Sequence, residues 1–156
     1  MSADISAPLA VRKSIVVAAP LERAFELFTD GVATWWPQAT HSIHEDEVET
    51  VVLEPREGGR MYERTRSGEE AHWAFVRVWE PPHRLVLEWA VNPRKPPTEI
   101  EVRFSAAEDG TRVELTHTGW EAYGERAADG RAGYDTGWDR VLGRFAEALH
   151  SARTPE

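Results

Sequence analysis

The sequence contains no cysteine among its 156 residues, which excludes disulfides, thiolate metal ligands and cysteine nucleophiles. It also has no apolar run near the roughly 18 residues that a membrane-spanning helix needs. The first eight residues, M-S-A-D-I-S-A-P, lack the basic-then-apolar order of a secretory signal. These absences predict a cytoplasmic protein that does not insert into a membrane.

Basic residues are fewer than acidic ones. Lysine and arginine total 18 against 27 aspartates and glutamates, which gives a formal net charge of −9. Nucleic-acid grooves and anionic membrane surfaces both require basic patches, so the sequence predicts that neither is a partner. The chain also lacks a phosphate-binding glycine loop, a dinucleotide fingerprint and a Ser-His-Asp signature, and we expect no cofactor.

Tryptophan, by contrast, is abundant, with seven residues in the chain. Large aromatic side chains fill wide spaces or line apolar pockets. The length fits one domain with a substantial core. We expect residues 1–9 to form a flexible tail and residues 10–151 to form the domain.

Hydrophobic periodicity predicts a block of strands between helices, which is an α+β architecture. Pro20 suits the first position of a helix, and Gly31 is expected to end that helix as a left-handed cap. One more helical turn is expected before Pro37. The predicted helices cover residues 20–30 and 131–151, and the predicted strands cover residues 12–18, 43–53, 60–65, 71–79, 84–91, 98–105 and 111–118.

The last two strands alternate cleanly between apolar and polar residues, which is typical of a sheet with one face covered. The long C-terminal helix is the element available to cover that face. A curved sheet that grips one helix leaves a concave apolar space, where small ligands bind. The stripe of that helix expected to be buried consists of Tyr134, Trp138, Val141 or Leu142, Phe145 and Leu149.

Several strings, in this order, resemble the SRPBCC superfamily (START-like, birch-pollen-allergen-like). Within it they are most similar to bacterial homologues of the activator of heat-shock-protein-90 ATPase, the AHSA1-like family. The strings are I-V-V-A-A-P-L-E-R-A-F-E-L-F-T-D at 15–30, W-W-P at 35–37, L-E-P-R-E-G-G-R at 53–60, W-E-P-P-H-R-L-V-L-E-W at 79–89, G-T-R-V-E-L-T-H at 110–117 and G-Y-D-T-G-W-D-R-V-L at 133–142.

The resemblance implies a helix-grip fold, in which an antiparallel sheet of about six to seven strands wraps around a long C-terminal helix. It also implies a deep cavity between the concave sheet face and that helix. It supplies no catalytic motif to carry over. The ligand-binding residues expected on this basis are Trp35, Trp36, Leu87, Trp89, Val102, Phe104, Leu115, His117, Tyr134 and Trp138.

Two of these expectations have alternatives. Two adjacent tryptophans on one short turn are not expected to point inward together. One of Trp35 and Trp36 would then fill the core while the other lies on a rim, gates the cavity or contacts a partner. His117 is either a core histidine satisfied by hydrogen bonds or a polar anchor and proton donor for a ligand oxygen.

Glu63 is the second candidate for catalysis. If it points inward it is a buried acid, and if it points outward it pairs with an arginine. Within residues 71–79, either the even-numbered or the odd-numbered side chains could face the cavity. His41 and His44, followed by three acidic residues, are poorly spaced for shared ligation on a strand, so we predict no metal site.

Three functions remain open. The first is a domain that binds a small hydrophobic molecule. The second is an enzyme of cyclase, dehydratase or hydrolase type that acts on a hydrophobic substrate in the same cavity. The third is a co-chaperone-like interaction domain. Exposed aromatic residues permit a homodimer without requiring one.

Overall fold

The computed structural model of the chain describes residues 10–37, 43–91, 96–120, 124–125 and 127–153. In this part of the chain, seven strands form one antiparallel sheet in the order β1-β7-β6-β5-β4-β3-β2. The elements are β1 (Val11–Val17), α1 (Leu21–Thr29), η3 (Val32–Thr34), η4 (Glu45–Glu47), β2 (Val48–Leu53), β3 (Arg60–Thr65), β4 (Glu70–Glu80), β5 (Arg84–Trp89), β6 (Thr98–Ala107), β7 (Gly110–Thr118) and α2 (Ala127–Arg153).

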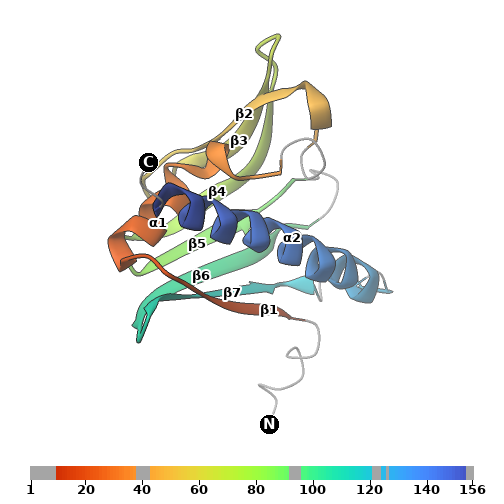
Figure 1. The fold of residues 1–156 in the computed structure, drawn as a ribbon. Coiled ribbons are helices and arrows are strands. Elements are labelled where there is room, and N and C mark those ends of the chain that lie inside the picture. Colours follow the sequence, from red (N-terminus) through yellow and green to blue (C-terminus); the bar gives the residue numbers. More distant parts are fainter. Residues whose placement is uncertain (1–9, 38–42, 92–95, 121–123, 126, 154–156) are drawn as a thin grey trace.

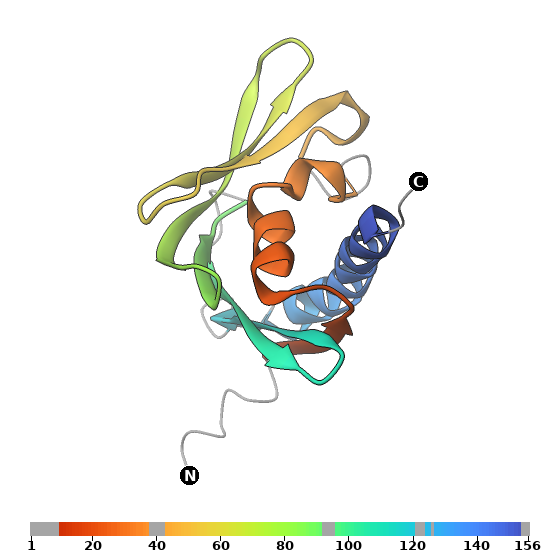
Figure 2. The same ribbon diagram turned by 60° about the vertical axis from the view of Figure 1, so that its left-hand side comes forward.

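The sheet curls, and α2 crosses its concave face (Figure 1). Figure 2 shows α1 inside the curl, between the sheet and α2, and α1 contacts β6, β7 and α2. This arrangement confirms the predicted helix-grip α+β fold. Within the described residues, neither helix combines the length and apolarity needed to cross a membrane.

The predicted apolar faces meet in the core. On β6 and β7, Ile100 pairs with His117, Val102 with Leu115 and Phe104 with Val113. All six side chains are buried, so the alternation correctly identified the inward face. The inward stripe of α2 is confirmed too, and its buried members are Trp138, Val141, Leu142, Phe145 and Leu149.

Strand β4 does not keep one face inward, because two irregularities shift its register. The shifts fall between Met61 and Tyr62 of β3, opposite Trp73, and between Val76 and Val78 of β4 itself. Each extra residue in a bulge reverses the alternation that follows it. Neither alternative for this strand is therefore correct as stated, and the inward set is Trp73, Ala74, Val76 and the half-buried Trp79.

Three local predictions are wrong. Pro20 precedes α1 as its N-cap with an extended backbone, instead of being its first helical residue. Gly31 has φ −91°, so the first helix ends without a left-handed glycine. The expected strand 43–53 begins only at Val48, because residues 45–47 form the 3-10 turn η4.

Gly110 is the glycine whose missing side chain matters most for the sheet. It begins β7 with φ +150°, a conformation that L side chains rarely adopt. A Cβ atom there would overlap the carbonyl oxygen of Val17. Because Val17 pairs with Thr111, this close approach joins the end of β1 to the start of β7.

We expect Gly110→Ala to lower the free energy of unfolding by more than about 2 kcal/mol, because it adds both backbone strain and overlap. Gly143→Ala is the matched control, since Gly143 is exposed in α2 with open space around its Cβ position. That substitution should stabilise the protein by about 0.5–1 kcal/mol. Urea unfolding of both variants measures the difference, and similar effects of the two would contradict the close approach.

Candidate functional site

Aromatic side chains fill the half of the concave space beside α1. The ring of Phe28 lies 5.3 Å from that of Trp35, 5.6 Å from Phe104 and 5.1 Å from Phe145, measured between ring centres. Phe25 packs against the other side of Phe104 at 5.1 Å. Two predicted ligand-binding residues, Trp35 and Phe104, therefore belong to a close-packed core.

The adjacent tryptophans both point inward, contrary to expectation. Trp35 is 1% exposed and Trp36 is 7% exposed. They diverge because η3 ends at residue 34. The indole N–H of Trp35 donates to the carbonyl oxygen of Leu27 at 2.8 Å, whereas the Trp36 ring packs 5.1 Å from Trp73 on the sheet. Neither ring forms an exposed rim.

Four tryptophans fill the other half of the space, and we call them the tryptophan cluster. They are Trp36, Trp73, Trp89 and Trp138, from four separate segments of the chain. Neighbouring ring centres are 5.1–6.3 Å apart, within the range of favourable aromatic pairs. The structure thus brings together three predicted site residues and adds Trp73, whose position the bulge in β4 determines.

His117 lies against this cluster and is fully buried. The indole Nε1 of Trp138 lies 3.1 Å from Nδ1 of His117, and Nε2 of His117 lies 2.7 Å from Oγ1 of Thr98. An indole N–H can only donate, so Nδ1 is an acceptor. Burial lowers the pKa of His117 to about 3, so the ring is neutral near pH 7. Its single proton is therefore on Nε2 and is donated to Thr98.

This assignment leaves the Thr98 hydroxyl hydrogen unused. Oγ1 of Thr98 accepts from His117, and among the described residues His117 is the hydroxyl's sole hydrogen-bond partner. Thr98 is 4% exposed, so a buried donor is available beside His117. Sequence reasoning missed Thr98, although it shares the inward face of β6 with Ile100 and Val102.

Tyr134 extends the polar part of the site. Its hydroxyl accepts a hydrogen bond from the indole Nε1 of Trp89 at 2.9 Å. Its ring lies 4.9 Å from His117 and 5.3 Å from Trp120. Trp120, which sequence reasoning also missed, donates to the backbone oxygen of His117. The predicted residues Leu87, Val102 and Leu115 are buried on the same face of the sheet.

Glu63 points inward and is completely buried, which is the first of the two orientations considered for it. Its carboxylate accepts four hydrogen bonds of 2.7 Å, from the backbone N–H of Ile43, the backbone N–H and Nδ1 of His44, and Nε1 of Trp73. Both oxygens are therefore occupied by protein donors. The carboxylate holds Ile43 and His44, which directly precede η4, against the sheet.

The charges of Glu63 and His44 support each other. Burial acts to raise the pKa of Glu63, but the donors from Ile43, Trp73 and His44 together hold it below its ordinary value. The hydrogen bond to Glu63 raises the pKa of His44 above its ordinary value. His44 thus pairs with the carboxylate, and His41 lies outside the described residues.

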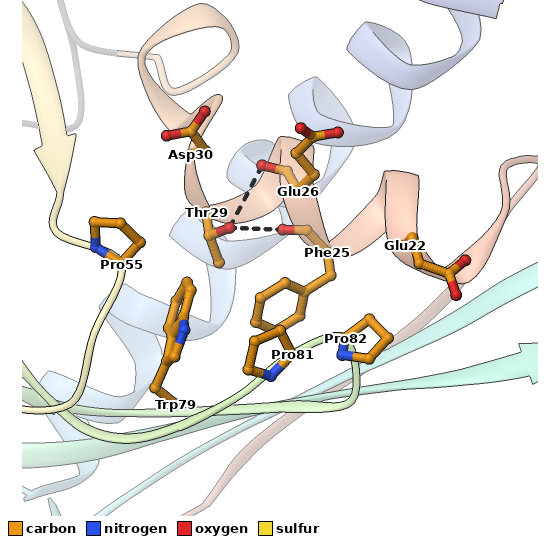
Figure 3. A pocket seen from close by; sticks show the side chains of 9 residues that line it. All are labelled: Glu22, Phe25, Glu26, Thr29, Asp30, Pro55, Trp79, Pro81 and Pro82. Atoms are coloured by element: carbon orange, nitrogen blue, oxygen red, sulfur yellow. Dashed lines mark hydrogen bonds between the residues drawn. The ribbon is translucent and has the colours of Figure 1, made fainter.

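An open groove of about 500 Å³ lies between α1 and the turn that joins β4 to β5 (Figure 3). Sequence reasoning missed it, although the acidic residues of α1 recur every fourth position on one helical face. The groove is lined by Glu22, Phe25, Glu26, Thr29, Asp30, Pro55, Trp79, Pro81 and Pro82.

A family model described as "Activator of Hsp90 ATPase homolog 1-like protein" matches residues 18–150 of this chain. No curated protein matches the sequence. Among solved structures, the anthrahydroquino-γ-pyrone synthase Txn09, in a complex with SUM, is 33% identical. That match covers 88% of this chain and 95% of the synthase, with a TM-score of 0.59.

Two other solved structures share the fold at lower identity. Protein NE0264 from Nitrosomonas europaea is 16% identical, covers 96% of this chain and 99% of its own, and has a TM-score of 0.69. Protein MLL2253 from Mesorhizobium loti is 18% identical, covers 94% of this chain and 99% of its own, and has a TM-score of 0.66. At these identities the likeness shows the fold alone.

Replacing Glu63 tests its role as an anchor. Glu63→Gln should lower the free energy of unfolding by about 2–4 kcal/mol, because an amide nitrogen would face buried donors. His44→Gln should cost less, since His44 is partly exposed. The loss in free energy of unfolding caused by His44→Gln should shrink as pH rises through the raised pKa of His44, because His44 then loses its charge in the ion pair with Glu63. Urea unfolding at pH 5.5 and 8.5 measures both, and a harmless Glu63→Gln would refute the anchor.

Acid should destabilise the protein through His117. Between its ordinary pKa of 6.5 and the folded value of about 3, the unfolded chain binds a proton that the folded protein excludes. The contribution of His117 to the free energy of unfolding therefore falls as the pH falls, by up to about 1.4 kcal/mol per pH unit. In His117→Gln the loss of stability from pH 6 to pH 4 should be smaller than in the parent. Parallel stability curves for the two proteins would show that His117 is not held neutral.

Proposed function

The chain belongs to the family of proteins like the activator of Hsp90 ATPase homologue 1, and we propose that it binds a small hydrophobic molecule between the sheet and α2. The proposed ligand has a flat aromatic body and at least one oxygen that can accept a hydrogen bond. The observation that carries this proposal is the unused hydroxyl hydrogen of Thr98, which is buried beside His117.

The hydroxyl hydrogen of Thr98 is costly to leave without an acceptor. A buried donor without an acceptor costs about 1–3 kcal/mol, so such groups are rare unless ordered water, a ligand or an ion satisfies them. Here Trp138 and His117 orient the hydroxyl, because the indole fixes the proton of the imidazole on Nε2. A ligand carbonyl or phenol oxygen would accept from Thr98. Tyr134 and Trp120 supply ring faces close by.

A related enzyme gives specific support to a catalytic alternative. The synthase that is 33% identical is named for a fused aromatic product, and its likeness extends over 88% of this chain. We propose as a second candidate that this protein acts on a polycyclic aromatic substrate held at the same place. His117 is then a positioning residue, because its contact with the ligand runs through Thr98.

A panel of hydroxyanthraquinones, flavonoids and fatty acids tests the binding proposal. We expect at least one planar aromatic ketone to raise the melting temperature and quench tryptophan fluorescence, since such a ligand would contact indole rings. Thr98→Val should weaken its binding about fivefold or more, the worth of one buried hydrogen bond. Thr98→Ser, which keeps the hydroxyl, should bind nearly as well as the parent.

Thr111→Val is the matched control, because Thr111 is equally buried but its hydroxyl already donates to the backbone oxygen of Ala19. It should leave the affinity unchanged. Mass spectrometry of the same incubations separates the two candidates, since an enzyme converts the bound compound and a carrier returns it intact. If no compound of the panel binds, or if Thr98→Val binds as tightly as the parent, the proposal fails.

A further inference from the structure

Trp138 stands at the head of a series of hydrogen bonds that crosses three elements of the fold. Its Nε1 lies 3.1 Å from Nδ1 of His117, and Nε2 of His117 lies 2.7 Å from Oγ1 of Thr98. These residues belong to α2, β7 and β6 respectively, and all three are buried. Bulk water therefore does not compete for the contacts, and each hydrogen in the series must be placed by the protein.

The indole of Trp138 sets the direction in which this series donates. An indole N–H can donate but cannot accept, so Nδ1 of His117 has to present a lone pair to it. That requirement excludes the neutral tautomer with its proton on Nδ1, and it excludes the doubly protonated ring as well. The proton of His117 is then on Nε2 and is donated to Thr98. The hydroxyl hydrogen of Thr98 consequently points away from His117.

The opposite direction is chemically available whenever the indole N–H is absent. With its proton on Nδ1, His117 would accept from the Thr98 hydroxyl at Nε2, across the same 2.7 Å. Oγ1 of Thr98 would then present only lone pairs, which suit a ligand N–H or O–H. The two directions use the same heavy atoms and differ only in the positions of two hydrogens. The hydrogen bond from Trp138 selects between them.

We propose that Trp138 makes the site selective for a ligand that faces Thr98 with a ketone or quinone carbonyl, and against one that faces it with a hydroxyl or an N–H. This inference rests on the proposed function and narrows its ligand class. A carbonyl accepts the Thr98 hydrogen and brings no hydrogen of its own. A ligand donor can reach the second lone pair of Oγ1, but the Thr98 hydrogen then stays without an acceptor, which opposes binding. Trp138 is thus a positioning residue that acts through His117.

The position of the His117 proton tests the inference in the free protein. With ¹⁵N-labelled histidine, nuclear magnetic resonance distinguishes a ring nitrogen that carries a proton from one that does not, and His117→Gln identifies the signals. We expect the proton on Nε2 in the parent and both neutral tautomers in Trp138→Phe, which keeps a ring but removes the N–H. A proton on Nδ1 in the parent, or an unchanged tautomer in Trp138→Phe, would overturn the inference.

Trp35→Phe is the matched control for this measurement. Trp35 is as deeply buried as Trp138, but its indole N–H donates to the backbone oxygen of Leu27. Its replacement removes the same atoms and should leave the His117 signals unchanged. If Trp35→Phe changes the tautomer as much as Trp138→Phe does, the effect comes from disturbed packing and the inference is wrong.

Three planar tricyclic probes test the selectivity by equilibrium dialysis. Fluorenone, fluorene and carbazole have nearly the same frame and present a carbonyl, a methylene and an N–H at the same place. We expect the parent to bind fluorenone at least about tenfold more tightly than carbazole, because only fluorenone accepts the Thr98 hydrogen. In Trp138→Phe this ratio should fall below about threefold, since His117 can then adopt either tautomer. Equal binding of fluorenone and carbazole by the parent would overturn the inference whether or not the variant folds.

The outcomes separate failure of this inference from failure of the proposed function. If Thr98→Val binds fluorenone as tightly as the parent, the probe does not lie against Thr98, and the proposed function fails together with the inference. If fluorenone loses affinity in Thr98→Val but Trp138→Phe weakens all three probes equally, Trp138 contributes packing alone. The proposed function then stands and the selectivity is wrong. If the parent binds none of the three probes, the inference is overturned and the broader panel of compounds decides the proposed function.

Discussion

A seven-stranded sheet that curls around α1 and α2 encloses a wide space, and the way in which that space is filled governs the rest of the molecule. One half of the space takes α1 and its phenylalanines, and the other takes tryptophans. Each buried indole N–H then needs an acceptor that water cannot supply. For five of these indoles the acceptors are the backbone oxygen of Leu27 for Trp35, Glu63 for Trp73, Tyr134 for Trp89, the backbone oxygen of His117 for Trp120, and Nδ1 of His117 for Trp138.

The indoles explain why polar side chains occur in this core, and they also separate structural groups from candidates for ligand contact. Glu63 accepts four hydrogen bonds and has no capacity left, so its burial reflects anchoring. His117 is likewise satisfied at both nitrogens. The series of hydrogen bonds that runs from Trp138 through His117 ends at Thr98, whose hydroxyl hydrogen has no acceptor among the described residues. A search for perturbed pKa values or buried acids alone would have chosen Glu63 and His117 as the ligand-contacting residues. Counting hydrogen-bond donors and acceptors chooses Thr98, the partner of His117.

The sequence could predict those features that repeat along the chain. Residues 98–118 alternate because one face is wet, and α2 has helical spacing because one stripe is buried. In β4 the same reasoning failed, since a bulge reverses the face without any signal in the residue types. The inward turn of both Trp35 and Trp36 depends on where η3 ends. Pairs such as Trp138 with His117 join distant segments, and no local pattern predicts them.

The interior beside Thr98 favours ligands without charge, for reasons that follow from its surroundings. Inside, His117 is neutral because burial lowers its pKa to about 3, and Glu63, the one buried carboxylate among the described residues, is fully paired. A charged ligand entering this space would lose its hydration without gaining a counter-charge, so the interior favours neutral molecules.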